Sequence, residues 1–117
     1  MTTSDLAKDF TELLKRNDHQ GAAAKYNSDD IVSYEATTDE MAVCRGKEAV
    51  RQKGVWFEAN NEVHGGKVEG PFGNGDQFAV RFTMDLTPKA TGQRITMDEV
   101  GIYTVKDGKI VEERFYY

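Results

Sequence analysis

Three side chains with acid–base capacity are the strongest candidates for chemistry in this sequence: Glu35, His64 and Glu99. Each lies in or directly beside a segment that is predicted to be a β-strand. A carboxyl group in an apolar interior has a raised pKa, because burial disfavours its charged form. Such a group can exchange protons with a substrate near neutral pH. The chemistry expected from this set is proton abstraction next to a carbonyl group or activation of water, and neither requires a metal or an organic cofactor.

Aromatic and sulfur-containing side chains are expected to contact the ligand. A tyrosine, either Tyr34 or Tyr103, is suited to donate a hydrogen bond to an oxyanion that forms on the substrate. The other predicted contacts are apolar: Trp56, Phe82, Met84, Met97 and Phe115. The expected ligand is therefore a small hydrophobic or carbonyl-containing molecule held in a largely apolar pocket.

Each candidate also has a purely structural interpretation. Glu99 can pair with Arg81 or Arg114 across the sheet, which contributes about 0.2–1 kcal/mol when the pair is exposed. His64 precedes a Gly-Gly pair and fits an exposed turn, and Glu113 fits a surface position on the last strand. These alternatives stay open at the level of sequence.

No motif predicts a metal site, a phosphate loop or a disulfide. The two histidines, His19 and His64, stand apart from any ligand-spaced cluster, so no metal or cofactor is predicted. The glycine-rich run at 70–76 lacks the lysine followed by Ser or Thr of a phosphate loop, and it predicts a hairpin turn. The single cysteine, Cys44, has no partner within the chain and is interpreted as a structural thiol.

Length and charge limit the possible partners. The 117 residues fit one domain, 1–117, that is large enough to bury a core. A net charge of −5 with scattered Lys and Arg argues against nucleic acid, whose phosphates require a basic face. No segment approaches the ~20 apolar residues of a membrane span, and the polar start MTTSDLAKDF is not a signal peptide. We therefore expect a cytoplasmic protein without a membrane partner.

The elements that must position these candidates are helices first and strands second. Apolar residues at helical spacing predict a helix that Ser4 caps, an alanine-rich helix at 18–26, and a third at 46–60 with Trp56 and Phe57 on its apolar side. The segment 37–45 is predicted to be a loop, and the strand at 62–69 is predicted to end at Gly70-Pro71. The predicted strands are 31–36, 62–69, 78–86, 94–106 and 109–117. Helices segregated from an antiparallel sheet define an α+β fold.

Strand parity decides which side chains face the interior. Phe78, Val80, Phe82 and Met84 alternate cleanly and must be covered. On the last two strands both alternating sets contain apolar residues, so periodicity alone leaves the choice open. The sets that contain Tyr103 and Phe115 are favoured as the helix-facing side, because these aromatics suit packing against Phe10 and Trp56. This choice turns Glu99 and Glu113 inward, where a carboxylate is costly unless it is paired or functional.

The segment ITMDEVGIYTVKDGKIVEERFYY, residues 95–117, resembles the terminal hairpin of the SnoaL-like families in the nuclear transport factor 2-like superfamily. The amphipathic first helix, the stretch 26–30 and the opening RGKEAV at 45–50 extend this resemblance over nearly the whole chain. The resemblance implies a cone-shaped α+β barrel of cystatin-like arrangement, with a curved sheet wrapped around three helices.

Several activities occur in the superfamily, so the resemblance does not select a reaction. They include polyketide cyclases, a steroid isomerase, epoxide hydrolases, dehydratases, and binding or assembly domains without activity. The steroid isomerase places a tyrosine and a second acid where this chain has Phe10 and Gly101, so that reaction is not expected. Most members dimerise through the outer sheet face, which implies a homodimer.

Three functions stay open: a cofactor-independent isomerase, lyase or hydrolase, a non-catalytic ligand-binding domain, and a dimerisation module with a filled interior.

Overall fold

The computed structural model describes all 117 residues and contains three helices and six strands. The helices are α1 (Thr3–Lys15), α2 (His19–Tyr26) and α3 (Lys47–Asn60). The strands are β1 (Asn27–Tyr34), β2 (Val43–Arg45), β3 (Asn61–Asn74), β4 (Gln77–Pro88), β5 (Ile95–Lys106) and β6 (Lys109–Tyr116). None of the helices is long and apolar enough to cross a membrane.

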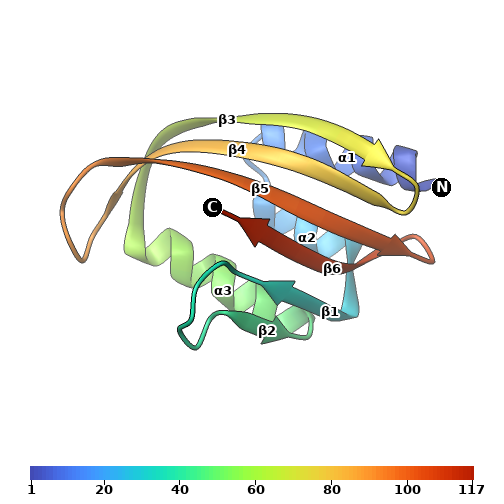
Figure 1. Ribbon diagram of the computed structural model, residues 1–117, viewed down its shortest axis with the longest axis horizontal. Helices are drawn as coiled ribbons and strands as arrows, with labels where there is room; N and C mark the ends of the chain where they lie inside the picture. Colours follow the sequence, from blue (N-terminus) through green and yellow to red (C-terminus); the bar gives the residue numbers. More distant parts are fainter.

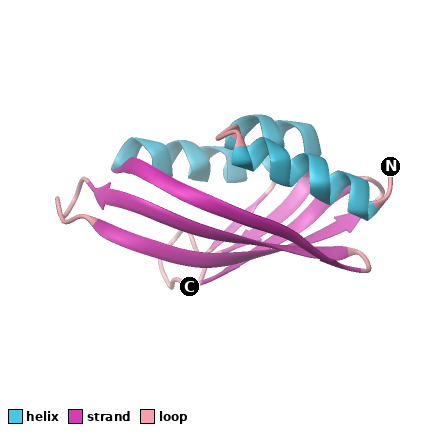
Figure 2. Cartoon of the chain, turned by 90° about the horizontal axis from the view of Figure 1, so that it is seen from above, coloured by secondary structure: helices cyan, strands magenta, loops and turns pink.

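The strands form one mixed sheet in the order β2-β1-β6-β5-β4-β3. Only β1 and β6 run parallel, and all other neighbours are antiparallel (Figure 1). The edge strands β2 and β3 do not pair with each other, so the sheet is curved but not closed into a barrel. Figure 2 shows the three helices on one side of the sheet. The predicted α+β class, with a curved sheet around three helices, is confirmed.

Local capping explains where the first two helices begin. Thr2 rather than Ser4 caps α1: its hydroxyl accepts from the Asp5 N–H, and the Asp5 carboxylate accepts from the Thr2 N–H. This reciprocal capping box satisfies two amides that would otherwise be unpaired at the helix end. The side chain of Asp18 accepts from the Gly21 N–H at the start of α2 in the same way.

The β5–β6 hairpin sets the register on which the candidate site depends. Asp107 and Gly108 both have positive φ, 53° and 74°, as a two-residue turn that matches the strand twist requires. The register places Tyr103 opposite Glu113 and Gly101 opposite Phe115. One irregularity between Thr104 and Val105 shifts the pairing near the turn, so Ile110 rather than Val111 is buried in the core.

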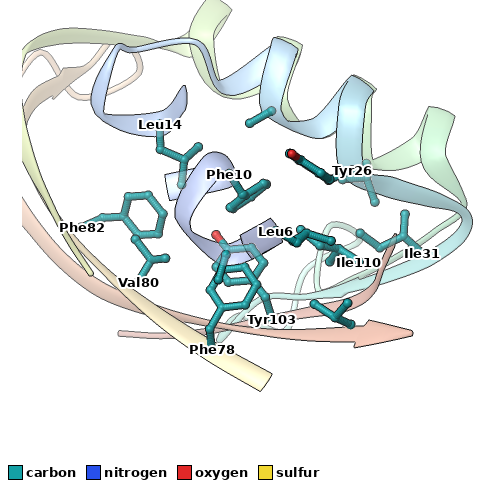
Figure 3. Packing of buried hydrophobic residues seen from close by; sticks show 14 residues of the cluster. Leu6, Phe10, Leu14, Tyr26, Ile31, Phe78, Val80, Phe82, Tyr103 and Ile110 are labelled. Carbon is teal, nitrogen blue, oxygen red and sulfur yellow. The ribbon is translucent and has the colours of Figure 1, made fainter. Parts of the chain in front are cut away.

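The core lies between α1, α2 and the concave face of the sheet (Figure 3). The Tyr103 ring stacks on Phe78 at a centroid distance of 5.0 Å and meets the edge of Phe10 at 4.9 Å. Tyr103 and Phe78 are each 2% exposed. The contact predicted between Tyr103 and Phe10 is confirmed, and with it the parity that turns Glu99 and Glu113 toward the helices.

Three predicted segments differ from the structure by more than two residues. Strand β1 begins at Asn27, earlier than predicted, and the segment predicted as a loop contains the short edge strand β2. Strand β3 continues through Gly70-Pro71, where its pairing with β4 shifts register between Glu69 and Phe72. A proline is compatible with this position because β3 is an edge strand, where the N–H that proline lacks can face away from the sheet.

Candidate functional site

Glu99 projects from the middle of β5 onto the concave face. Its direct neighbour on β4 is Phe82, which is 6% exposed, and the next pair along the two strands is Met84 with Met97. Both methionines and Glu99 are half-buried. The cross-strand partners considered from sequence are engaged elsewhere, since Arg81 forms a bidentate pair with Asp98 on the outer face. Glu99 therefore stands among apolar side chains without an arginine partner.

Burial governs the ionisation of Glu99. Loss of solvent raises the pKa of its carboxyl to about 7, the nearby negative charges of Glu35 and Glu113 act in the same direction, and Lys53 opposes them. No hydrogen bond to the protein contributes to this shift. A carboxyl group with a pKa near neutrality has the proton affinity that general acid–base catalysis requires.

Lys53 is the centre of a polar network between α3 and the sheet. Its ammonium group donates to Glu35 Oε1 at 2.8 Å and to the Ser33 hydroxyl. It also lies 4.0 Å from Glu113 Oε1 and 5.2 Å from the centroid of the Phe115 ring. The side chains of Lys53, Glu35 and Glu113 are 13%, 19% and 10% exposed, so this is a largely desolvated ion cluster. Such clusters are maintained only where every charge has partners.

Glu35, directly after β1, and Glu113, on the adjacent strand β6, are held in place. Tyr117 donates its phenol proton to Glu35 Oε2 at 3.1 Å. Burial and the Glu35 charge raise the pKa of Tyr117 to about 12, so its phenol stays protonated and able to donate. Burial also raises the pKa of Glu113, against the opposing effects of Lys53 and a hydrogen bond from Ser33.

Tyr103 closes the inner end of the site. Its pKa is raised well above the usual value, first by burial and then by the three glutamates. A Cβ atom at Gly101 would lie 3.0 Å from the Tyr103 hydroxyl and from the Phe115 ring. The absence of a side chain at Gly101 is therefore what lets both rings lie against the strand beside Glu99.

Three predicted site residues lie outside this cluster. His64 is exposed and bonds Thr87 at 2.8 Å on the convex face of the opposite edge of the sheet. Tyr34 faces outward, because its neighbours Ser33 and Glu35 point inward, and its ring packs 4.0 Å from the Arg114 guanidinium. These two predicted placements in the pocket are wrong.

The prediction that Trp56 lines the pocket is also wrong, because its side chain is 51% exposed and is not part of the core. A helix advances about 100° per residue, so Trp56 lies about 100° around α3 from Phe57. Val50, Lys53 and Phe57 share the side that faces the sheet, and Gly54 turns toward Gln20 of α2. This rotation leaves Trp56 at the margin of the helix in solvent.

Two cavities of the structure lie away from this cluster. The larger, about 380 Å³, lies between the start of α1 and the β3–β4 hairpin. The smaller, about 70 Å³, lies between α2 and the start of α3. Neither is lined by a predicted site residue. No group of three His, Cys, Asp or Glu side chains is arranged to hold a metal ion.

Sequence reasoning missed Lys53, Ser33 and Tyr117 as members of the cluster. The spacing of Val50, Lys53 and Phe57 was the available signal for Lys53. This lysine follows Val50 by three residues and precedes Phe57 by four, so it lies on the same apolar face of the helix. An ammonium group buried on such a face needs an anionic partner. Ser33 and Tyr117 carried no comparable signal, because their roles depend on the pairing of β1 with β6.

A crystal structure from Mesorhizobium loti is 69% identical over 100% of both chains, with a TM-score of 0.99. That protein is described as a candidate SnoaL-like polyketide cyclase, with carbohydrate phosphatase as a second description. A nuclear transport factor 2-like protein from Burkholderia thailandensis has a TM-score of 0.83 at 19% identity, covering 99% of this chain and 90% of its own.

A third structure, a candidate polyketide cyclase from Pseudomonas putida, has a TM-score of 0.70 at 18% identity and covers 100% of this chain and 92% of its own. At such identities these two likenesses show the fold alone. No curated protein matches the chain in sequence. The family model of the SnoaL-like domain matches residues 1–117. This chain therefore belongs to the SnoaL-like domain family, as the hairpin at 95–117 indicated.

Proposed function

We propose that this protein binds a small carbonyl-containing molecule beside Glu99 and catalyses a proton transfer on it without a cofactor. The observation that carries this proposal is the state of Glu99: a half-buried carboxyl with a pKa of about 7, free of hydrogen bonds from the protein. Its carboxylate takes the proton next to the carbonyl, and the electron pair of the broken C–H bond moves onto the carbonyl oxygen as an enolate. Tyr103, which lies on the same strand and the same face as Glu99, is the candidate donor to that oxygen.

The descriptions of the Mesorhizobium loti relative differ in how well they fit this site. Cyclisation of a chain of ketones begins with loss of a proton next to a carbonyl, which suits Glu99. A phosphate ester carries negative charge, and the site holds three glutamates against one lysine that is already committed to them. The chemistry of the side chains therefore favours a neutral carbonyl substrate over a phosphate ester.

Proton exchange provides a test that does not need the natural substrate. The protein is incubated in D₂O with a panel of small ketones and 1,3-diketones, and loss of the α-proton signal is followed by NMR. We expect faster exchange than in buffer, with a rate that rises as the pH passes about 7 and Glu99 becomes ionised. Glu99→Gln should lower the enzymatic rate by about 10²–10⁴-fold, the usual contribution of a general base.

The matched control is Glu112→Gln, which removes a carboxylate from the outer face of β6 and leaves the concave face intact. Exchange in the Glu99→Gln protein that is as fast as in the wild type would exclude Glu99 as the base. Binding of panel compounds without any exchange would instead identify a non-catalytic ligand-binding domain. Mass spectrometry of small molecules that co-purify with the protein identifies the ligand class directly.

We also propose a homodimer through the outer face of the sheet. Val100 and Ile102 occupy outward positions on β5, and Tyr116 is 54% exposed at the end of β6. Apolar side chains gathered on one face are typical of an interaction surface. Sedimentation equilibrium at micromolar concentration should give twice the chain mass, and a monomer there would contradict the proposal.

A further inference from the structure

The concave face of the sheet continues beyond Glu99 as a surface of partly exposed apolar side chains. Three rows of cross-strand neighbours cross β3, β4 and β5 on this face: Val68 with Phe82 and Glu99, Gly66 with Met84 and Met97, and Val63 with Leu86 and Ile95. Neighbours in a row point to the same side of the sheet, and Phe82 belongs to the core on the helix-facing side. Glu99 is the only ionisable side chain in the three rows.

Exposure increases along the inward side chains of β5 with distance from the core. Tyr103 is buried, Glu99 and Met97 are half-buried, and Ile95 is 40% exposed. Val63, at the other end of the Ile95 row, is 49% exposed. Glu99 therefore lies where the packed interior ends, with aromatic side chains on one side of it and open apolar surface on the other.

The polar side chains at the junction of α3 and β3 are engaged by the helix itself. Asn60 donates to the carbonyl oxygen of Trp56 at 2.8 Å, and Asn61 donates to the carbonyl oxygen of Phe57 at 2.9 Å. The rows beside this junction carry no charge. A polar or charged group placed over them would lose water without gaining a partner, so this surface favours an apolar occupant.

Four side chains form this surface, which we call the apolar strip: Val63, Met84, Ile95 and Met97. It is too small for a protein partner, since a stable interface uses about 20–30 residues on each side. Ile95 lies four residues from Glu99, which is about 13 Å of extended strand. A small molecule with an elongated body spans this distance, and methionine side chains adapt readily to the shape of such a body.

We infer that the substrate is an elongated ketone, which lies with its carbonyl group beside Glu99 and its apolar body along the strip toward Ile95 and Val63. This inference rests on the proposed function for the place of the carbonyl group. It adds the class of substrate, its direction in the site, and a length of body that a compact ketone does not have.

The methionine methyl groups provide a direct probe of binding. The chain has four methionines, of which Met84 and Met97 belong to the strip. Protein labelled with ¹³C at these methyl groups is titrated by NMR with straight-chain methyl ketones from butanone to decanone. We expect shifts at Met84 and Met97 and none at Met1 or Met41. The dissociation constant should fall about two- to fourfold for each added methylene group, because each buries further apolar surface.

A variant at the far end of the strip separates the body of the ligand from its head. Ile95→Gln should weaken decanone binding about fivefold and leave butanone binding unchanged, because only the longer chain reaches this row. The matched control is Thr96→Gln, at the next residue of β5, which is exposed on the outer face opposite Asp85. This control should bind both ketones as the wild type does.

Decanoate tests the direction of the ligand. At pH 8 its carboxylate would meet the ionised carboxylate of Glu99, so decanoate should bind about tenfold more weakly than decanone. Glu99→Gln removes this repulsion and should narrow the difference. Decanoate that binds as tightly as decanone to the wild type would show that the head does not lie at Glu99, and would overturn the inference.

Three other results would also overturn it: no shift at either methionine of the strip, an affinity that is independent of chain length, or equal losses of decanone binding in Ile95→Gln and Thr96→Gln. These measurements need no turnover. If long ketones bind as expected but their α-protons do not exchange, the assigned ligand stands and the proposed catalysis is wrong. If ketones exchange through Glu99 but longer chains gain no affinity, the proposed function stands and the elongated substrate does not.

Discussion

Glu99→Gln should make the protein more stable at alkaline pH while removing its proposed activity. The wild-type chain stabilises the protonated form of Glu99, because its pKa rises from the ordinary value of 4.5 to about 7 on folding. Each unit corresponds to about 1.4 kcal/mol, so the difference of about 2.5 units amounts to about 3 kcal/mol. Glutamine is neutral at every pH, so the variant does not lose this free energy when the pH rises.

The sign of the effect defines a pH window. Below pH 4.5 Glu99 is protonated in both the folded and the unfolded chain, and the two proteins should differ little in free energy of unfolding. Between pH 4.5 and about 7 the unfolded chain releases the proton while the folded chain retains it, so the wild type loses stability relative to the variant. Above pH 7 the variant should be more stable by up to about 3 kcal/mol, which is about 10 °C in Tm for a domain of this size.

Urea denaturation from pH 4 to pH 9 measures this difference. The Glu112→Gln protein serves as control, and its curve should run parallel to that of the wild type, because Glu112 is an outer-face residue with only a 4.0 Å contact to Arg114. The reasoning is refuted if Glu99→Gln is no more stable than the wild type at pH 8, or if its advantage is the same at pH 4.

Two further changes probe the network around Glu99. Lys53→Met leaves the buried Glu113 carboxylate without its cation and should lower the free energy of unfolding at pH 7 by about 3–5 kcal/mol. The control Lys67→Met changes an exposed ion pair and should cost less than about 1 kcal/mol. Equal losses in urea denaturation would show that the cluster does not depend on Lys53. Gly101→Ala places a methyl group 3.0 Å from two aromatic rings and should cost about 1–3 kcal/mol and displace their ring-proton NMR signals. At Gly65 a Cβ meets nothing within 4 Å, so Gly65→Ala should leave those signals in place, and an unshifted spectrum in the Gly101 variant would contradict the packing argument.

Much of the fold could be predicted because its signals are local. The apolar spacing of α1, the alternation along β4 and the turn at Asp107-Gly108 each act within a few residues. These elements are the ones that the structure confirms. Strand β2 was missed because three residues at an edge carry no periodic pattern, and β3 was predicted too short because bulges interrupt its alternation.

The site was predictable only in part, for a related reason. Glu99 and Tyr103 lie four residues apart on β5, so their side chains point to the same face of the sheet. The aromatic residues indicated that this face is the inward one, and both side chains were therefore placed correctly. Tyr34 was placed wrongly because the inward side of β1 carries Ile31 and Ser33, which are both fully buried, and Tyr34 belongs to the other alternating set. His64 was placed wrongly because a bulge at Val63 and Gly65 turns it to the convex face.

The sequence alone determined that this chain folds as one curved sheet over helices, that it belongs to the SnoaL-like family, and that Glu99 lies on an apolar strand face. Only the tertiary structure decided the state of that carboxyl. Its proton affinity depends on burial, on a lysine of α3, on a glutamate directly after β1 and on another glutamate on β6, which lie far apart in the chain. Electrostatic interactions act through space in a medium whose dielectric constant is set by packing, so no local pattern of residues encodes their sum.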